Sequence, residues 1–286
     1  MAQVTSDPLV SPDWLRAHLV DPNLAILDAS WFLPGGELDP EDEFTKGHIP
    51  GALRFRIDEI CDRTSPLPHM LPSSAAFAEA VSAMGIGADT TVVIYDSLGL
   101  FSSPRVWWTF RVMGCNNVHV LDGGLPGWVS RGFPLATGAA RPRPPKRFPP
   151  RFNEALVRDL EQVRDALATG AAQIVDARPR ARFTGAASEP RPGVRAGHMP
   201  GALNLPYADV IEGERLAGAD RLRSVFESSG VALDRPIITT CGSGVSAAVL
   251  ALALASIGRR DVAVYDGSWS EWGARADTPV VQGTSP

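Results

Sequence analysis

Short runs of Val, Ile and Leu alternate along the whole chain with longer amphipathic segments. The runs at residues 26–29 and 174–177 have the composition of buried β-strands, whereas residues 73–84 and 159–168 have the length and patterning of amphipathic helices. Strands that alternate with helices in this way predict an α/β fold, in which a mainly parallel sheet is covered by helices on both faces. We therefore expect the chemistry in loops at the carboxyl ends of the strands.

The pattern of the first half of the chain returns in the second. Four segments recur with nearly the same spacing: residues 26–29 as 174–177, the Gly-His loop 47–52 as 197–202, residues 92–96 as 237–241, and residues 121–128 as 265–272. This repeat predicts two homologous domains in tandem. Residues 136–150 are dense in proline, arginine and glycine, which disfavour a regular element, so we expect a linker there. The expected domains are then residues 1–135 and 151–286.

The composition narrows the class of protein. With 44% hydrophobic residues, 21% charged residues and a formal net charge of −5, the chain has the balance of a soluble globular protein. It has no basic stripe with interleaved aromatic residues, so nucleic-acid binding is not expected. The apolar stretch at residues 247–257 is too short to span a bilayer and predicts a buried helix. Because the N-terminus lacks the features of a signal peptide, we expect no membrane association and a cytoplasmic location.

Three cysteines, Cys61, Cys115 and Cys241, lie far apart and form no Cys-x-x-Cys pair, so neither a disulfide framework nor a zinc site is expected. Only Cys241 stands in a sequence that suggests chemistry. The strand-like run 236–240 precedes it, and Gly-Ser-Gly-Val-Ser and an alanine-rich helix follow it. In such a turn, backbone N–H groups and the helix dipole stabilise a thiolate or a bound anion. The first half has Asp96 at this position, so we expect only the second domain to be catalytic.

The residues around Cys241 leave four interpretations open. The first is a small buried side chain, which is common for a free cysteine. The second is a dinucleotide site, because residues 242–247 fit Gly-x-Gly-x-x-Ala, although the first half shows no trace of that pattern. The third is a phosphatase, which requires an arginine where this chain has Ala247. The fourth is sulfur transfer, in which the thiolate keeps a sulfur atom as a persulfide stabilised by backbone amides.

The tandem domains, the paired Gly-His-[Ile/Met]-Pro-Gly-Ala loops and the loop from Cys241 to Ser246 resemble the rhodanese superfamily over almost the whole chain. In that superfamily, thiosulfate sulfurtransferases carry Arg and Lys after the cysteine. The 3-mercaptopyruvate sulfurtransferases carry Cys-Gly-Ser-Gly-Val-[Thr/Ser], which is the sequence found here. The resemblance therefore implies two tandem rhodanese-like domains and a sulfurtransferase that uses 3-mercaptopyruvate, forms a Cys241 persulfide and releases pyruvate. It implies a thiol acceptor, such as thioredoxin or a small thiol, or cyanide, and no metal or organic cofactor.

The resemblance also implies roles for individual residues. Arg182 and Arg191 correspond to two substrate-binding arginines, whose guanidinium groups suit the carboxylate and keto oxygen of an α-keto acid. Ser243, His69 and Asp58 correspond to a proposed relay, in which Ser243 and His69 manage a proton and Asp58 orients the imidazole. The loop residues expected to bind the donor are Gly242, Gly244, Val245 and Ser246.

Several other conspicuous residues are expected to be structural. Both copies of the Gly-His loop keep their histidine, including the copy without the cysteine, so His48 and His198 are not expected to be catalytic. The tryptophans expected in the core are Trp107, Trp108, Trp128 and Trp272, and the arginines expected in surface ion pairs are Arg178, Arg180 and Arg195.

Two alternatives to the preferred function stay open at this point. One is a thiosulfate sulfurtransferase, which differs only in its donor. The other is a catalytically silent rhodanese-type module that binds a partner or carries sulfur.

Overall fold

The computed structural model describes residues 7–33 and 36–283, and their contacts group them into two units. The first unit contains the described residues up to Arg63, together with Leu71–Asn153 and Gly213–Leu216. The second contains Thr64–Met70, Glu154–Glu212 and the described residues from Ala217 onward. The segment Thr64–Met70 therefore belongs to the second unit, although it lies in the first half of the chain.

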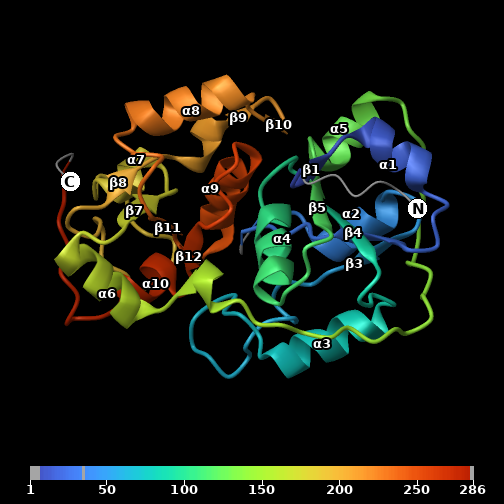
Figure 1. Ribbon diagram of the computed structural model, residues 1–286, viewed down its shortest axis with the longest axis horizontal. Helices are drawn as coiled ribbons and strands as arrows, with labels where there is room; N and C mark the ends of the chain where they lie inside the picture. Colours follow the sequence, from blue (N-terminus) through green and yellow to red (C-terminus); the bar gives the residue numbers. More distant parts are fainter. Residues whose placement is uncertain (1–6, 34–35, 284–286) are drawn as a thin grey trace. The chain divides into compact units, whose positions relative to one another are not determined.

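A five-stranded parallel sheet forms the centre of the first unit (Figure 1). Neighbouring strands run parallel in the order β1-β5-β4-β2-β3. The strands are β1 (Leu9–Val10), β2 (Leu24–Asp28), β3 (Ala52–Arg54), β4 (Thr91–Tyr95) and β5 (Val118–Leu121). The helices are α1 (Pro12–His18), α2 (Pro40–Lys46), α3 (Ser74–Ala83), α4 (Ser103–Val112) and α5 (Gly124–Ser130). The short strand β10 (Arg215–Leu216) also belongs to this unit.

The second unit repeats this sheet with the strand order β6-β12-β11-β7-β8, and its neighbouring strands are again parallel. The strands are β6 (Val157–Arg158), β7 (Gln173–Asp176), β8 (Leu203–Asn204), β11 (Ile237–Thr240) and β12 (Ala263–Tyr265), with β9 (Ile211–Glu212) outside the sheet. The helices are α6 (Leu160–Thr169), α7 (Arg180–Phe183), α8 (Ala219–Ser228), α9 (Val245–Ser256) and α10 (Ser268–Trp272), with 3₁₀ turns η1 (Glu154–Leu156) and η2 (Tyr207–Val210). Two tandem α/β units with parallel sheets confirm the predicted fold class.

Helix α9 is apolar on all sides, and this explains its place in the second unit. Ten of its twelve residues are buried. A helix without a polar face is stable when neighbouring elements cover it all round. Helix α9 contacts β11, β12, α8 and η2, so the predicted buried helix at residues 247–257 is confirmed. Within residues 7–33 and 36–283, no helix is long and apolar enough to cross a membrane.

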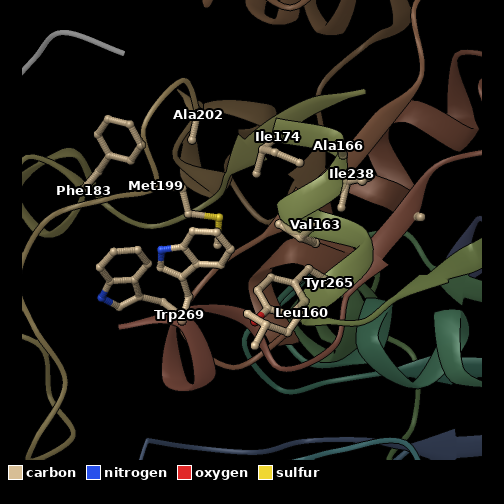
Figure 2. Packing of buried hydrophobic residues seen from close by; sticks show 12 residues of the cluster. Leu160, Val163, Ala166, Ile174, Phe183, Met199, Ala202, Ile238, Tyr265 and Trp269 are labelled. Carbon is tan, nitrogen blue, oxygen red and sulfur yellow. The ribbon is translucent and has the colours of Figure 1, made fainter. Parts of the chain in front are cut away.

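Helices α6 and α10 pack on the other face of this sheet from α9 (Figure 1). Helix α6 begins with a capping box, in which Asp159 and Gln162 each accept the other's backbone N–H. Its apolar side chains belong to one core cluster with β7, β11 and β12, which includes Leu160, Val163, Ala166, Ile174, Ile238 and Tyr265 (Figure 2). The four tryptophans expected in the core are all buried.

The Gly-His loop has the same structural role in both units. The His48 Nδ1 atom lies 2.8 Å from the Phe44 carbonyl oxygen, and the two rings stack with centroids 3.9 Å apart. His198 repeats both contacts with Phe183, at 2.8 and 3.8 Å. The backbones of His48 and His198 also form antiparallel bridges, to Ala136 and to Val281. Both histidines are buried and structural, as the repeat predicts.

The core of the first unit can be tested with two identical substitutions. Val93 in β4 is fully buried, whereas Val20 is 91% exposed. We expect Val93→Ala to lower the free energy of unfolding by about 2–3 kcal/mol, because it removes buried methyl groups and leaves a cavity. We expect Val20→Ala to change it by less than about 0.5 kcal/mol. Urea denaturation of both variants measures the difference, and equal destabilisation would contradict this core.

Candidate active site

Cys241 lies where strand β11 ends and the turn into α9 begins. The strand ends at Thr240 and the helix begins at Val245, so the turn is only four residues long. Gly244 adopts a left-handed conformation, with φ of 78°, which favours glycine at the residue that precedes the helix. Cys241 is 2% exposed and Ser243 is 7% exposed. The thiol therefore lies at the carboxyl end of a buried central strand, as the sequence predicts.

Helix α10 holds the Cys241 turn in place. The Trp269 N–H donates to the Cys241 carbonyl at 2.9 Å. The Gly242 carbonyl accepts from the Ser270 N–H at 2.8 Å and from the Ser270 hydroxyl at 2.6 Å. Because these bonds satisfy the first two carbonyls of the turn, its backbone is fixed independently of any substrate.

Ser268, at the start of α10, adopts a strained backbone conformation beside the cysteine. Its φ is 49°, in the left-handed region that is uncommon for residues other than glycine, and the equivalent residue of the repeat is Gly124 with φ of 53°. The Ser268 hydroxyl donates to the Tyr265 carbonyl at 2.8 Å, and the Ser268 hydroxyl oxygen accepts from the Cys241 N–H at 3.4 Å. Strain of this kind concentrates at functional sites.

The equivalent turn of the first unit gathers hydrogen-bond donors around a negative charge. Asp96 stands in place of the cysteine and is fully buried. Its Oδ2 atom accepts from the backbone N–H groups of Phe101, Ser102 and Ser103 at 2.8–3.0 Å, and from the Ser103 hydroxyl at 2.6 Å. Its Oδ1 atom accepts from the Leu98 N–H at 3.0 Å. In this unit the donors are therefore occupied by a carboxylate of the protein itself.

Arg182 is the predicted site residue that the structure brings to the Cys241 turn. It lies on the short helix α7, which follows β7 next to β11 in the sheet. A Cβ atom on Gly242 would lie 3.0 Å from the Arg182 Nη2 atom. Glycine at position 242 thus allows the guanidinium group to approach the backbone directly after Cys241. The Arg182 side chain is 23% exposed and is paired with Glu189.

Arg178 is buried, which corrects the expectation of a surface ion pair. Its side chain is 1% exposed and donates to both carboxylate oxygens of Asp176 and to Glu189 at 2.6–3.1 Å. The guanidinium group also lies 4.2 Å above the Trp269 ring and donates to the Gly197 carbonyl at 2.9 Å. Burial alone would lower the pKa of Arg178, but the two carboxylates outweigh it and raise that pKa. Arg178 is therefore a structural centre of the loops around the site.

The expectation that Arg195 forms a surface ion pair is also wrong. It is half-buried and donates to main-chain carbonyls of Trp272, Gly273 and Thr278 at 3.0–3.2 Å, so it fixes the segment after α10. Arg180 is exposed, so its expected place on the surface is confirmed, whereas its ion pair stays a prediction.

The remaining predicted site residues fall in both units. Arg191 is half-buried in the loop that follows Glu189. His69 is 6% exposed, has a φ of 58°, and belongs to the segment Thr64–Met70 of the second unit. Asp58 is exposed in the first unit, where it accepts a hydrogen bond from the Trp31 indole N–H at 2.8 Å.

Sequence analysis did not identify the residues that position Arg182 and the Cys241 turn by hydrogen bonds. These residues are Glu189, Arg178, Ser268 and Ser270. Glu189 lies in the stretch Ser-Glu-Pro-Arg that resembles the family, but no spacing marks it as the partner of two arginines. Its role depends on a loop that returns to α7.

A pocket of about 680 Å³ lies elsewhere in the second unit. Arg180, Thr184, Asn204 and Arg221 are among the residues that line it, whereas Cys241 and Arg182 are not. This hollow is separate from the turn that carries the thiol. In the part of the chain that the structure describes, no three His, Cys, Asp or Glu residues are placed to hold a metal ion.

Comparison with known proteins agrees with this geometry. The family model of the rhodanese-like domain matches residues 11–131 and again residues 159–275. The chain belongs to the rhodanese family. The resemblance inferred from the sequence is thereby confirmed, and each of the two rhodanese domains corresponds to one of the parallel sheets described above.

Relatives of this rhodanese carry the names of both sulfurtransferase branches. It is 46% identical to the 3-mercaptopyruvate sulfurtransferase of Escherichia coli, over 95% of this chain and 96% of the relative. It is 42% identical to the thiosulfate sulfurtransferase of Bos taurus, over 98% and 97%. A crystal structure of a 3-mercaptopyruvate sulfotransferase from Escherichia coli matches with a TM-score of 0.84 and 42% identity, covering 92% of this chain and 99% of that one.

The two cysteines outside the turn should be poor nucleophiles at neutral pH. Burial raises the pKa of Cys115 to about 11, and burial together with the charge of Asp58 raises the pKa of Cys61. At about pH 8, roughly one Cys115 in a thousand would be a thiolate. We expect iodoacetamide to modify Cys115 slowly at pH 7 to 8, and faster as the pH approaches 11. Peptide mass spectrometry measures this, and rapid modification at pH 7 would contradict it.

Proposed function

We propose that this rhodanese is a 3-mercaptopyruvate sulfurtransferase. The observation that carries the proposal is the turn from Cys241 to Ser246, which contains no lysine or arginine and has Arg182 against Gly242. A dianionic donor would gain from cations within the turn, whereas a neutral mercaptopyruvate thiol does not need them. The 46% identity to a 3-mercaptopyruvate sulfurtransferase over almost the whole chain supports the same donor.

In the first step, the Cys241 thiolate attacks the thiol sulfur of 3-mercaptopyruvate. A sulfur–sulfur bond forms and the carbon–sulfur bond breaks, and its electron pair moves into the pyruvate enolate. A proton then converts the enolate to pyruvate, which leaves. The persulfide that remains on Cys241 is an anion at the amino-terminal end of α9, where backbone N–H groups stabilise it.

Arg182 and Arg191 bind the donor in this proposal. Their guanidinium groups hold the carboxylate and the keto oxygen of the α-keto acid and stabilise the charge that develops on the enolate. The position of Arg182 against Gly242 supports this assignment. The loop residues Gly242, Gly244, Val245 and Ser246 form the remaining contacts with the donor.

Ser243 and His69 manage the proton of the donor thiol or of the enolate, and Asp58 orients the imidazole. The burial of Ser243 and His69 supports this relay, because proton transfer is most effective in a site protected from water. His69 also belongs to the same unit as the nucleophile, despite a separation of 172 positions in the chain.

In the second step, an acceptor thiolate or cyanide attacks the outer sulfur of the persulfide and restores the Cys241 thiolate. We propose thioredoxin or a small thiol as the acceptor. The three free cysteines favour a reducing compartment, and we place the enzyme in the cytoplasm.

Thiosulfate remains the second candidate donor, because the Bos taurus relative named for it is 42% identical. The two donors are compared by their kcat/KM values with the same acceptor. We expect 3-mercaptopyruvate to be preferred, and persulfide formation to add one sulfur atom to the Cys241 peptide in a mass spectrum. Cys241→Ser should abolish pyruvate formation, while Cys115→Ser retains it. A higher kcat/KM for thiosulfate would contradict the proposed donor, and absence of the added sulfur would indicate a silent module.

The proposed binding of the donor carboxylate by the two arginines, here called the carboxylate clamp, is tested by Arg191→Ala. We expect this change to raise KM for 3-mercaptopyruvate by about tenfold to a hundredfold, since it removes a charge-assisted hydrogen bond from the donor. Arg180→Ala, which removes an exposed arginine of the same unit, is the matched control and should leave KM unchanged. An unchanged KM in Arg191→Ala would mean that the clamp is assigned to the wrong residue.

A further inference from the structure

Four charged side chains of the second unit form one connected network, and Glu189 links its two arginines. Arg178 donates to Asp176 at 2.6–3.1 Å and to the Oε1 atom of Glu189 at 2.7 Å. Arg182 donates to Glu189 from its Nε atom at 3.3 Å, and also from its Nη2 atom. Three of these side chains are at most 3% exposed, and Arg182 alone reaches solvent, with 23% of its side chain exposed.

Arg182 brings this network to the turn that carries the nucleophile. Its Nη2 atom is the atom that would lie 3.0 Å from a Cβ on Gly242, and the same atom donates to Glu189 Oε2. Glu189 therefore fixes the direction of the Arg182 guanidinium group. It also places a negatively charged carboxylate in direct hydrogen-bond contact with that group.

The charges of the network balance. Two carboxylates, of Asp176 and Glu189, face two guanidinium groups, of Arg178 and Arg182. Because most of the network is shielded from water, each of its charges acts strongly on an anion nearby. A dianion such as thiosulfate carries twice the charge of a mercaptopyruvate carboxylate, so Glu189 repels it about twice as strongly.

We infer that Glu189 is a specificity-determining residue for the sulfur donor. It aims Arg182 at the turn and cancels the excess positive charge of that arginine, so that a monoanionic α-keto acid is preferred to a dianionic donor. The inference rests on the proposed function, because it takes Arg182 as a donor-binding residue. Glu189 acts through Arg182 and is a positioning residue.

The experiment replaces Glu189 with glutamine, which keeps the shape and one acceptor oxygen but removes the charge. We measure kcat/KM for thiosulfate and for 3-mercaptopyruvate in wild type and in Glu189→Gln. The ratio of the thiosulfate value to the mercaptopyruvate value should rise by about tenfold, because the freed positive charge favours the dianion. Higher salt should reduce this gain, since ions screen the partly exposed Arg182.

Two further variants separate charge from position. Glu161→Gln removes the same charge from an exposed pair with Arg164 on α6, at 3.0 Å, and should leave the ratio unchanged. Glu189→Asp keeps the charge but shortens the side chain. We expect it to raise KM for 3-mercaptopyruvate while the donor ratio stays close to that of wild type.

The outcomes are distinct. Equal loss of activity toward both donors in Glu189→Gln, with an unchanged ratio, would overturn the inference and leave Glu189 a structural residue. If wild type prefers thiosulfate or forms no persulfide, the proposed function fails before Glu189 is considered. Circular dichroism checks folding, and if Glu189→Gln does not fold, Glu189→Ser, which leaves room for water beside Arg178, gives the same comparison with the same expected direction.

Discussion

The turn after the central strand β4 points backbone N–H groups toward one place, and a negative charge at that place is stabilised. In the first unit this charge is the buried carboxylate of Asp96, which accepts hydrogen bonds from four main-chain N–H groups and one hydroxyl group. In the second unit, Cys241 stands at the same position of the repeat. A thiolate and its persulfide are the anions that a transfer reaction needs there. The proposed reaction site therefore lies at a position that both units share, the carboxyl end of the central strand.

The duplicated fold separates the residues that hold the structure from those that carry chemistry. The indole N–H of Trp128 donates to the Pro134 carbonyl, and that of Trp272 to the Pro279 carbonyl, both at 2.9 Å. The carbonyl of Asp96 accepts from Leu125 N–H at 3.0 Å, as that of Cys241 does from the equivalent Trp269. Such pairs keep their geometry in both copies.

Other equivalent pairs differ in charge, and these differences define the site. The residue before the stacked Phe183 is Arg182, whereas the residue before its counterpart Phe44 is Glu43. Where the second unit has Cys241 and an arginine against the next residue, the first has the carboxylates of Asp96 and Glu43. At these two positions the first unit would therefore repel an anionic donor.

Local patterns in the sequence were sufficient to predict the fold, the buried helix α9 and the turn at Cys241, because these depend on runs of neighbouring residues. The alternation of apolar runs and amphipathic segments places β7, β11 and α6 within one or two residues of their observed ends. Arg178 could not be assigned in this way. Its partners, the Gly197 carbonyl and the Trp269 ring, are brought to it by tertiary packing, and nothing in the local sequence distinguishes a buried arginine from a surface one.

A buried ion network is costly to form, because each charge loses its hydration, and apolar residues of similar size would often stabilise the protein as well or better. The network of Asp176, Arg178, Glu189 and Arg182 is thus difficult to explain by stability alone. The network does fix the direction of the partly exposed Arg182 guanidinium group. Glu189 holds this group, and the buried Arg178 holds Glu189. A flexible surface arginine would lose conformational entropy each time it bound an anion, whereas Arg182 has lost most of it on folding. The desolvation cost of the network is therefore best understood as the cost of holding one positive charge, of limited strength, beside the turn that carries the thiol.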